Sequence, residues 1–254
     1  MNVLNAGRAF ARMARLGSLG AAIRFTVARL IGRETVRINM KGNSLLLRVA
    51  STDAKVAMGS LDGEFDVLKS TLDADFAGLV VDGGAYIGTA SLALADLFPN
   101  ATIVAVEASA ENFDILVKNV ASKPNIKPVN AALFHEAGLT LDLTDREKGA
   151  WGYSVIKRSR DNLDARKIQT IKTTTIDEIR KAYPELTLGV IKLDIEGAEK
   201  ELFEKAGVQL DEAHVVLVEL HDRIVDGCRT AFQEFSRNRK TLKCGHEKHL
   251  SIAT

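Results

Sequence analysis

The feature that most constrains this chain is an apolar run that stops at a group of glycines, VVDGGAYIG at residues 80–88. The run predicts a buried strand, a tight turn and then a helix over residues 89–97. A second strand is predicted at residues 102–106, and an acid, Glu107, follows it directly. Strand, glycine turn, helix, strand and acid is the order in which an α/β sheet holds the ribose of a nucleotide-like cofactor.

The spacing of the glycines separates two classes of cofactor. A dinucleotide site is typical of G-x-G-x-x-G, which turns a helix N-terminus toward a pyrophosphate. Gly83, Gly84 and Gly88 do not have that spacing, and Asp82 precedes them. An acid there suits a ligand with a cationic amino-acid group and no phosphates, such as S-adenosylmethionine. A turn without a ligand is the alternative, but the preceding strand and Glu107 favour cofactor binding.

Composition limits the class of protein and its partners. The chain has 254 residues, enough for one α/β domain with attachments, and its 46% hydrophobic content is ordinary for a soluble globular protein. The net charge of +1 gives no argument for a nucleic-acid partner. Two cysteines, Cys228 and Cys244, fit no zinc spacing or disulfide framework, so we expect a cytoplasmic location.

The N-terminal segment, residues 1–34, is the one biased part of the chain. Its first 33 residues contain six arginines and no acid, and apolar residues recur at roughly helical spacing. We therefore expect a basic amphipathic helical extension. Three interpretations stay open: a helical cap packed on the domain, a peripheral membrane contact with anionic lipid through residues 1–33, or an organellar transit peptide, for which one serine, Ser18, is few.

The rest of the chain predicts a doubly wound α/β fold. Residues 35–39 and 44–49 alternate around a Gly-Asn turn and indicate a hairpin. Strands then alternate with helices, which is typical of a mostly parallel sheet. The predicted strands lie at residues 79–82, 102–106, 124–132, 189–195 and 215–220, the helices at 89–97, 111–122, 176–182, 198–205 and 226–237, with edge strands in 241–252. Residues 139–143 and 154–157 predict a small antiparallel insert that serves as a lid or substrate wall.

Polar residues end each predicted strand, where ligands of such sheets bind. Asp82, Glu107 and Asn130 end the first three strands, the fourth runs into KLDIEG at residues 192–197, and the fifth into ELHD at residues 219–222. Charged residues at the mouths of buried strands are costly unless they are paired or used in chemistry. These positions are therefore candidate site residues.

Two residues of this set are the predicted catalytic groups. Alternation along the fourth strand places Lys192, Asp194 and Glu196 on one side, and we predict that Asp194 lies beside the cofactor and the reacting hydroxyl. His221 has an ordinary pKa that suits a general base at neutral pH, with Glu219 or Asp194 orienting its ring. The alternatives are a salt-bridge network around Lys192 and a histidine that is hydrogen-bonded for structure.

A metal site is a further hypothesis at the same place. Asp194, Glu196, Glu219 and His221 offer the carboxylates and imidazole that suit Mg, Mn or Fe. No compact ligand motif supports such a site, and we predict none. Glu196 and Glu219 are instead candidate substrate-binding residues.

The predicted insert carries two aromatic residues, Trp151 and Tyr153, beside Gly152. Aromatic faces commonly stack on sugar rings, so we predict that both residues form part of an acceptor wall. Plain packing of the single tryptophan is the alternative.

Four segments together resemble the FkbM-type S-adenosylmethionine-dependent methyltransferases. They are DGGAYIG at residues 82–88, EAS at 107–109, NAA at 130–132 and IKLDIEGAE at 191–199. The similarity covers about residues 45–250 and leaves the N-terminal extension outside. The I-K-x-D-x-E-G block is its most specific part, because many methyltransferases share the glycine turn.

The resemblance implies a Rossmann-like class I methyltransferase fold in a single domain, residues 35–254, with a cofactor-binding core at 78–240. It implies S-adenosylmethionine as the cofactor and O-methylation of a sugar, glycan or related natural product. The implied cofactor residues are Asp82, Gly83, Gly84, Ala85 and Gly88 on the methionine side, Glu107 and Ala108 at the ribose, and Asp194 near the transferred methyl. Ala108 stands where the family usually has proline.

Two other functions stay open at this stage. A nicotinamide-dependent oxidoreductase would use a related sheet, although the glycine spacing counts against it. A non-catalytic methyltransferase-like scaffold would keep the sheet without turnover. The expected partner is a small-molecule or glycan acceptor and no nucleic acid.

Overall fold

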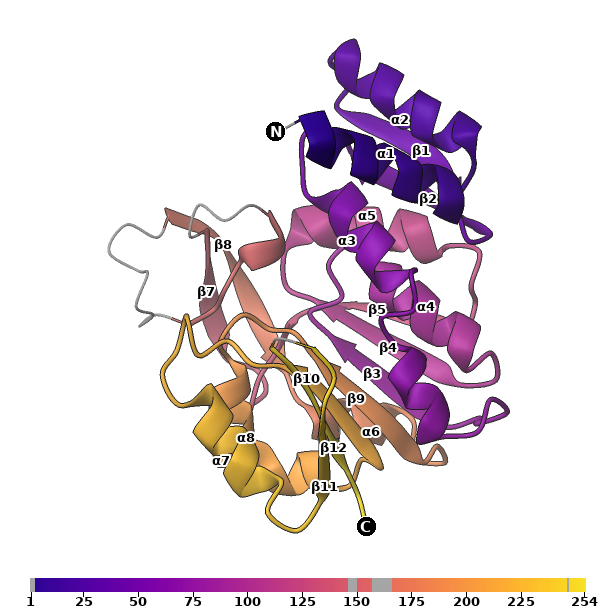
Figure 1. Cartoon of the computed structure of the whole chain (residues 1–254). Coiled ribbons are helices and arrows are strands. Elements are labelled where there is room, and N and C mark those ends of the chain that lie inside the picture. The colour runs from indigo at the N-terminus through magenta and orange to yellow at the C-terminus, as the bar shows by residue number, and fades with distance from the viewer. Residues whose placement is uncertain (1–2, 146–149, 157–165, 246) are drawn as a thin grey trace.

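The computed structural model describes residues 3–145, 150–156, 166–245 and 247–254. Its centre is a seven-stranded sheet in the order β11-β12-β10-β9-β3-β4-β5 (Figure 1). Strand β12 runs antiparallel to β10 and β11, whereas β10, β9, β3, β4 and β5 are parallel. The strands are β3 (Leu79–Gly83), β4 (Thr102–Glu107), β5 (Ile126–Asn130), β9 (Leu188–Leu193), β10 (Val215–Glu219), β11 (Lys240–Lys243) and β12 (Lys248–Ile252). This is the predicted doubly wound sheet, and its order reverses between β3 and β9, where such sheets bind ligands.

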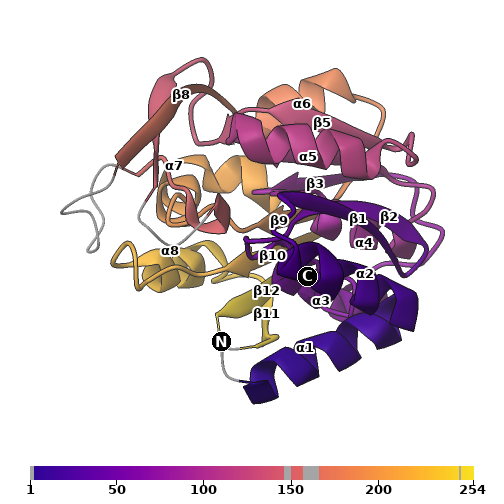
Figure 2. The ribbon, with the colours of Figure 1, turned by 90° about the horizontal axis from the view of Figure 1, so that it is seen from above.

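Both faces of the sheet are covered, because its strands are apolar on both sides. In β3, Val80 joins the core on one face and Val81 joins the core on the other. One face packs α3 (Asp53–Ser60), α4 (Thr89–Leu97) and α5 (Ala110–Val120), and the other packs α6 (Ile176–Ala182), α7 (Glu199–Asp211) and α8 (Cys228–Phe235). In the view from above, α7 and α8 lie to the left of the central strands and α4 lies to the right (Figure 2). A short 3-10 helix, η1 (Asp66–Ser70), follows α3.

The N-terminal extension forms two helices where the sequence predicts one helical segment. They are α1 (Val3–Leu16) and α2 (Leu19–Leu30), and the hairpin of β1 (Thr35–Met40) and β2 (Asn43–Arg48) follows them. Gly17 lies between the two helices, where the chain passes close to the hairpin. A Cβ there would stand 2.3 Å from the Asn39 carbonyl oxygen, so only glycine permits this close contact with β1. Ser18 then caps α2 by accepting a hydrogen bond from the Ala21 amide at 3.0 Å.

The extension packs on the domain through small and selected apolar residues. Met13 and Leu16 of α1 and the alanines of α2 are buried in the core that also contains the hairpin. Arg12 and Arg15 both pair with Asp62 after α3. Most of the larger aliphatic residues of α2 face outward, whereas Phe25 packs on the core, so the apolar spacing in the sequence does not by itself mark the packed face of this helix. Within the described chain, every helix is too short or too polar to cross a membrane.

The insert is a three-stranded sheet in the order β6-β8-β7 (Figure 1). It consists of β6 (Ala132–Leu133), β7 (Thr140–Asp145) and β8 (Arg166–Thr174), and a single 3-10 turn, η2 (Ala150–Gly152), lies between β7 and β8. The predicted pairing of residues 139–143 with 154–157 is wrong, because β8 is the antiparallel partner of β7. Ser154 makes only an isolated bridge to Thr144, and Lys157 lies outside the described residues.

Candidate functional site

The glycine turn after β3 is clamped between the ends of β4 and β9. The amides of Gly84 and Ala85 donate hydrogen bonds to the Val106 carbonyl at 3.0 and 2.9 Å. Gly84 has a φ of +73°, and a Cβ there would stand 1.8 Å from the Asp194 carbonyl oxygen. Only glycine permits this conformation and this approach, so the turn brings the β3 backbone directly against the end of β9.

Lys192, at the end of β9, holds this turn from below. Its Nζ pairs with Asp82 Oδ1 at 3.0 Å and donates hydrogen bonds to the Gly84 and Gly83 carbonyls at 3.0 and 3.3 Å. Burial opposes the charged form of Lys192, but the charges of Asp82 and then Asp194 outweigh it and raise its pKa. The sequence indicated only that Lys192 could belong to a salt-bridge network. In the structure Lys192 connects β9, β3 and the turn.

Asp82 is fully buried, and its second carboxylate oxygen accepts a hydrogen bond from Ser91 at 2.6 Å. It lies beneath the turn instead of at its surface. Two more residues of the predicted cofactor set also pack inward. A Cβ on Gly83 would meet Leu133, and one on Gly88 would meet Val120 of α5. These three residues therefore shape the turn from behind.

Glu107 ends β4 with both carboxylate oxygens held in place. Oε2 accepts from the Tyr86 amide at 2.9 Å, and Oε1 accepts from the Ser109 amide at 2.9 Å and from Asn112 Nδ2 at 3.3 Å. Burial raises the pKa of Glu107 to about 7, against the lowering effect of those hydrogen bonds. A carboxylate offers about four lone-pair sites and three are occupied here, so Oε2 keeps acceptor capacity for a ligand hydroxyl.

Two cavities meet above the turn. The first, cavity A, encloses about 750 Å³ of empty space and is lined by Glu107, Ala108, Asn112 and apolar residues of β4 and β6. No lysine or arginine occurs among the described residues that line it. This lining suits an uncharged adenosine, whereas a pyrophosphate would lack a neutralising cation.

The second, cavity B, encloses about 860 Å³ and has a charged wall. Asp194, Glu219, Lys192 and Lys248 contribute to that wall. The cavities share several lining residues, among them Gly84 and Asp194. A ligand that extends along the turn from cavity A therefore reaches Asp194 and cavity B.

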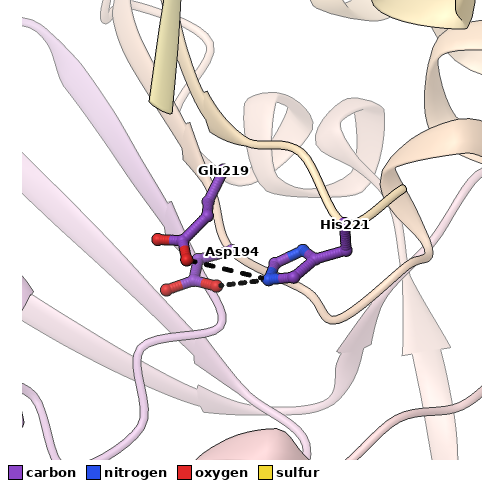
Figure 3. Close-up of side chains that lie close together, drawn as sticks. All are labelled: Asp194, Glu219 and His221. Carbon is purple, nitrogen blue, oxygen red and sulfur yellow. Dashed lines mark ion pairs between the residues drawn. The ribbon is translucent and has the colours of Figure 1, made fainter. Parts of the chain in front are cut away.

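A histidine lies behind the acids of cavity B (Figure 3). His221 Nδ1 is 2.8 Å from Glu199 Oε1, and Nε2 lies 3.7 Å from Asp194 Oδ1, 3.9 Å from Glu219 Oε1 and 3.6 Å from Glu196 Oε1. Burial lowers the pKa of His221, but the charge of Glu199 and then those of Glu196 and Asp194 outweigh it and raise the pKa to about 10. The cluster is therefore a region in which the protein stabilises positive charge.

His221 itself is 0% exposed and is absent from the described lining of both cavities. An acceptor in cavity B would reach this histidine only through Asp194 or Glu219, which lie in front of it. Glu219 is partly buried, and its pKa is raised to about 7, chiefly by burial and then by the charge of Asp194.

The predicted aromatic residues of the insert do face the crevice. Trp151 lines both cavities and Tyr153 lines cavity A. Glu196 is buried, adopts a φ of +52° and also lines cavity A. The structure thus brings Glu107, Ala108 and Asp194 together with the insert, although they lie far apart in the sequence.

Three site residues had no assigned role in the sequence analysis. Glu199, at the start of α7, accepts hydrogen bonds from the Ile195 and Gly197 amides and orients His221. Asn112 of α5 contacts Glu107, and its position one turn into a predicted helix is the only local signal. Lys248 comes from the tail, whose sequence carries no motif that indicates this position.

The arrangement expected of a methyltransferase domain is a doubly wound sheet with a glycine turn, a buried carboxylate on the next strand and a cofactor cavity without cations for a pyrophosphate. Cavity A meets this last condition among its described lining residues. The chain belongs to the FkbM methyltransferase family: the model of the Methyltransferase FkbM domain matches residues 82–247. This confirms the resemblance seen in the sequence, the class I methyltransferase fold and S-adenosylmethionine as the cofactor.

Individual relatives are more distant. The methyltransferase sdnD of Sordaria araneosa is 29% identical over 167 residues, which cover 55% of this chain and 62% of that protein. A putative transferase of Pyrococcus horikoshii has a TM-score of 0.47 at 13% identity and covers 91% of this chain and 84% of its own. Fibrillarin of Aeropyrum pernix, solved with S-adenosyl-L-methionine, has a TM-score of 0.42 at 11% identity, with 87% and 82% covered.

Proposed function

We propose that the protein is an O-methyltransferase that transfers the methyl group of S-adenosylmethionine to a hydroxyl of a sugar, a glycan or a related natural product. One observation carries the proposal: an apolar cavity with a buried carboxylate meets a charged, open cavity at Gly84 and Asp194. The first has the lining that adenosine requires, and the second has the polar lining that a hydroxylated acceptor requires.

In this proposal the cofactor occupies cavity A and the turn. Glu107 accepts hydrogen bonds from two ribose hydroxyls, and Ala108 and Ala131 pack on the adenine. The backbone at Gly84 faces the aminocarboxylate end, and Asp194, where the two cavities meet, lies beside the transferred methyl group. The bound cofactor supplies an activated methyl group on a sulfonium, so the protein's main task is alignment.

The acceptor occupies cavity B in the same proposal. Its oxygen forms the bond to the methyl carbon, the carbon–sulfur bond breaks with its electron pair left on sulfur, and the hydroxyl proton passes by way of the neighbouring carboxylates to water. Holding the two reactants at attack distance supplies about 7–11 kcal/mol of the barrier. Asp194 and Glu219 accept the hydroxyl hydrogen bond, with His221 behind them as the charged group of the site. Trp151 and Tyr153 form the wall for a sugar ring.

The test is incubation with isotopically labelled S-adenosylmethionine and fractionated cell extract, followed by mass spectrometry of what gains the methyl group. A hydroxylated product is expected, and Asp194→Asn is expected to lower turnover roughly 10²–10⁴-fold. The matched control is Asp222→Asn, which alters an acid on the loop after β10 that accepts a hydrogen bond from the Arg229 amide and should keep its turnover. Tight cofactor binding without transfer to any acceptor would instead favour the scaffold alternative.

We propose further that α2 contacts an anionic membrane surface. Its outward face is a continuous apolar stripe at helical spacing, formed by Leu19, Ile23, Val27, Leu30 and Ile31, which are 46–79% exposed. Exposed arginines flank the stripe at Arg24, Arg29 and Arg33. An apolar helix face bordered by cations complements an anionic lipid surface.

If α2 contacts the membrane, mutation of its apolar stripe should abolish binding to anionic vesicles. Ile23→Glu with Leu30→Glu should abolish co-sedimentation of the protein with vesicles that contain anionic lipid, because it places two acids in the stripe. Val208→Glu alters a residue of α7 that is 83% exposed and should leave co-sedimentation unchanged. The proposal would be contradicted if the wild type, the Ile23→Glu/Leu30→Glu variant and Val208→Glu bound the vesicles equally well. Vesicle binding that does not change with salt concentration would also contradict it.

A further inference from the structure

His221 has the hydrogen-bonding arrangement of a metal-binding histidine. Glu199 already accepts amide hydrogen bonds from Ile195 and Gly197, so it is an ionised acceptor and His221 Nδ1 donates to it. This fixes the ring and turns Nε2 toward Asp194 and Glu219, where a cation has to displace the Nε2 proton that the neighbouring carboxylates favour. Nε2 is buried and has no hydrogen-bond partner within the described chain. An imidazole that donates one N–H to a carboxylate and presents its other nitrogen is typical of metal ligands.

Asp194 and Glu219 face that nitrogen in the same manner. Each carboxylate turns one oxygen toward His221 Nε2 and the other toward a lysine: Asp194 Oδ2 lies 3.8 Å from Lys192 Nζ, and Glu219 Oε2 lies 3.4 Å from Lys248 Nζ. The lysines thus orient the acids without occupying the oxygens that face the histidine. Figure 3 shows the three side chains converging from the ends of two neighbouring strands.

The distances suit a small cation after a minor adjustment. The three ligand atoms lie within 4.8 Å of one another, and Nε2 is 3.7 and 3.9 Å from the two oxygens. With metal–ligand bonds of about 2.1 Å, ligand atoms around a tetrahedral ion are about 3.4 Å apart. Side-chain rotation of Asp194 and Glu219 can close that difference, because their side chains are 35% and 22% exposed.

We propose that Asp194, Glu219 and His221 bind one divalent transition-metal cation on the acceptor side of the crevice. One imidazole nitrogen and two carboxylate oxygens are the donors that Mn²⁺, Fe²⁺ or Zn²⁺ accept, unlike softer or larger ions.

The position of the cation gives it a role in the proposed reaction, on which this inference rests. Asp194 and Glu219 line cavity B, so the open coordination positions face the acceptor. A divalent ion there polarises the acceptor hydroxyl as a Lewis acid and promotes loss of its proton to water before the oxygen bonds to the methyl carbon. His221 then acts as a ligand and does not need to touch the acceptor, in agreement with its complete burial.

The experiment measures Mn²⁺ binding to the full chain after treatment with EDTA and dialysis. The EPR signal of free Mn²⁺ decreases as the ion binds, so its loss reports the amount bound. Wild-type protein is expected to bind one Mn²⁺ per chain. Glu219→Gln should weaken binding at least roughly 10–100-fold, and Asp222→Asn, the adjacent acid outside the cluster, should bind as wild type does. Pulsed EPR should detect coupling to an imidazole ¹⁴N nucleus in the wild type that is absent in His221→Gln.

Three results would overturn the metal site: no saturable Mn²⁺ binding by the wild type, equal binding by Glu219→Gln and Asp222→Asn, or no ¹⁴N coupling in the wild type. The wild-type measurements decide the matter even where His221→Gln does not fold. Calorimetry of S-adenosylmethionine in EDTA separates this inference from the proposed function, because cavity A requires no ion. Cofactor binding without Mn²⁺ binding removes only the metal site, whereas loss of cofactor binding removes the proposed function.

Discussion

Replacing Glu107 with alanine is expected to raise the dissociation constant for S-adenosylmethionine roughly 10²–10³-fold, which corresponds to about 3–4 kcal/mol. Two causes add. The ribose loses a charged acceptor for its hydroxyls, and such hydrogen bonds contribute about 1.5–3 kcal/mol each. The amides of Tyr86 and Ser109 also lose their acceptor, so the turn that faces the cofactor is no longer held.

Isothermal titration calorimetry measures this effect directly. Asp114→Ala removes an exposed acid from α5, beside the same site, and its dissociation constant should stay within about twofold of wild type, since exposed charges contribute little. Glu107→Gln keeps one acceptor oxygen and should fall between the two. A Glu107→Ala protein that is folded by circular dichroism and binds the cofactor normally would remove Glu107 from the ribose role.

The carboxylate of Glu107 also determines in which direction the affinity for S-adenosylmethionine changes with pH. Burial raises the pKa of Glu107 to about 7 in the free protein, so a fraction of the molecules is protonated at neutral pH. Ribose hydroxyls donate to the ionised form and lower this pKa in the complex, so binding expels a proton. Affinity should therefore be constant above pH 7 and fall below it, by at most about tenfold per pH unit. Glu107→Gln should abolish that slope.

Much of the fold could be predicted from the sequence because local signals agreed with one another. The apolar run into Gly83 and Gly84 fixes a buried strand and a turn, and the acid at Glu107 fixes the end of the next strand. The register of the insert could not be predicted. Residues 154–157 and β8 both carry alternation that can pair with β7, and pairing partners are set by packing at long range.

The site shows the same limit at the level of single residues. The alternation along the strand predicts that Lys192 and Asp194 lie on the same side, and Lys192 Nζ lies 3.8 Å from Asp194 Oδ2. It does not predict that Lys192 also pairs with Asp82 of the neighbouring strand. Asp82 was predicted to line the cofactor, and the structure places it beneath the turn with Lys192. The orientation of His221 depends on Glu199, a residue at a helix start whose contact with another strand has no local signature. How deeply a residue such as Asp82 or His221 is buried depends on the packing of the whole core, whereas its position at the end of a strand can be read from the local sequence.

Lys192→Met is expected to destabilise the protein by about 3–5 kcal/mol. Methionine has a similar volume, so the cavity term is small, and the cost comes from the charge that stays behind. Asp82 would be a fully buried carboxylate with Ser91 as its remaining hydrogen-bond donor. The Gly84 carbonyl would also lose the Lys192 donor, whereas the Gly83 carbonyl keeps the Asp194 amide at 3.1 Å. Urea unfolding followed by circular dichroism measures the change. Lys205→Met, which breaks an exposed pair with Glu201 at 2.8 Å, should cost below about 0.5 kcal/mol.

The double variant Asp82→Asn with Lys192→Met separates a charge effect from a packing effect. If the unpaired carboxylate causes the loss, removing it restores part of the stability, and the two substitutions together cost less than their sum, with a coupling of roughly 0.5–3 kcal/mol. Additive losses would mean that Lys192 stabilises the turn through its carbonyl contacts alone. In the coupled case the ion pair beneath the turn adds to the ladder that joins β3 and β9, and the position of the turn between the two cavities depends on that pair.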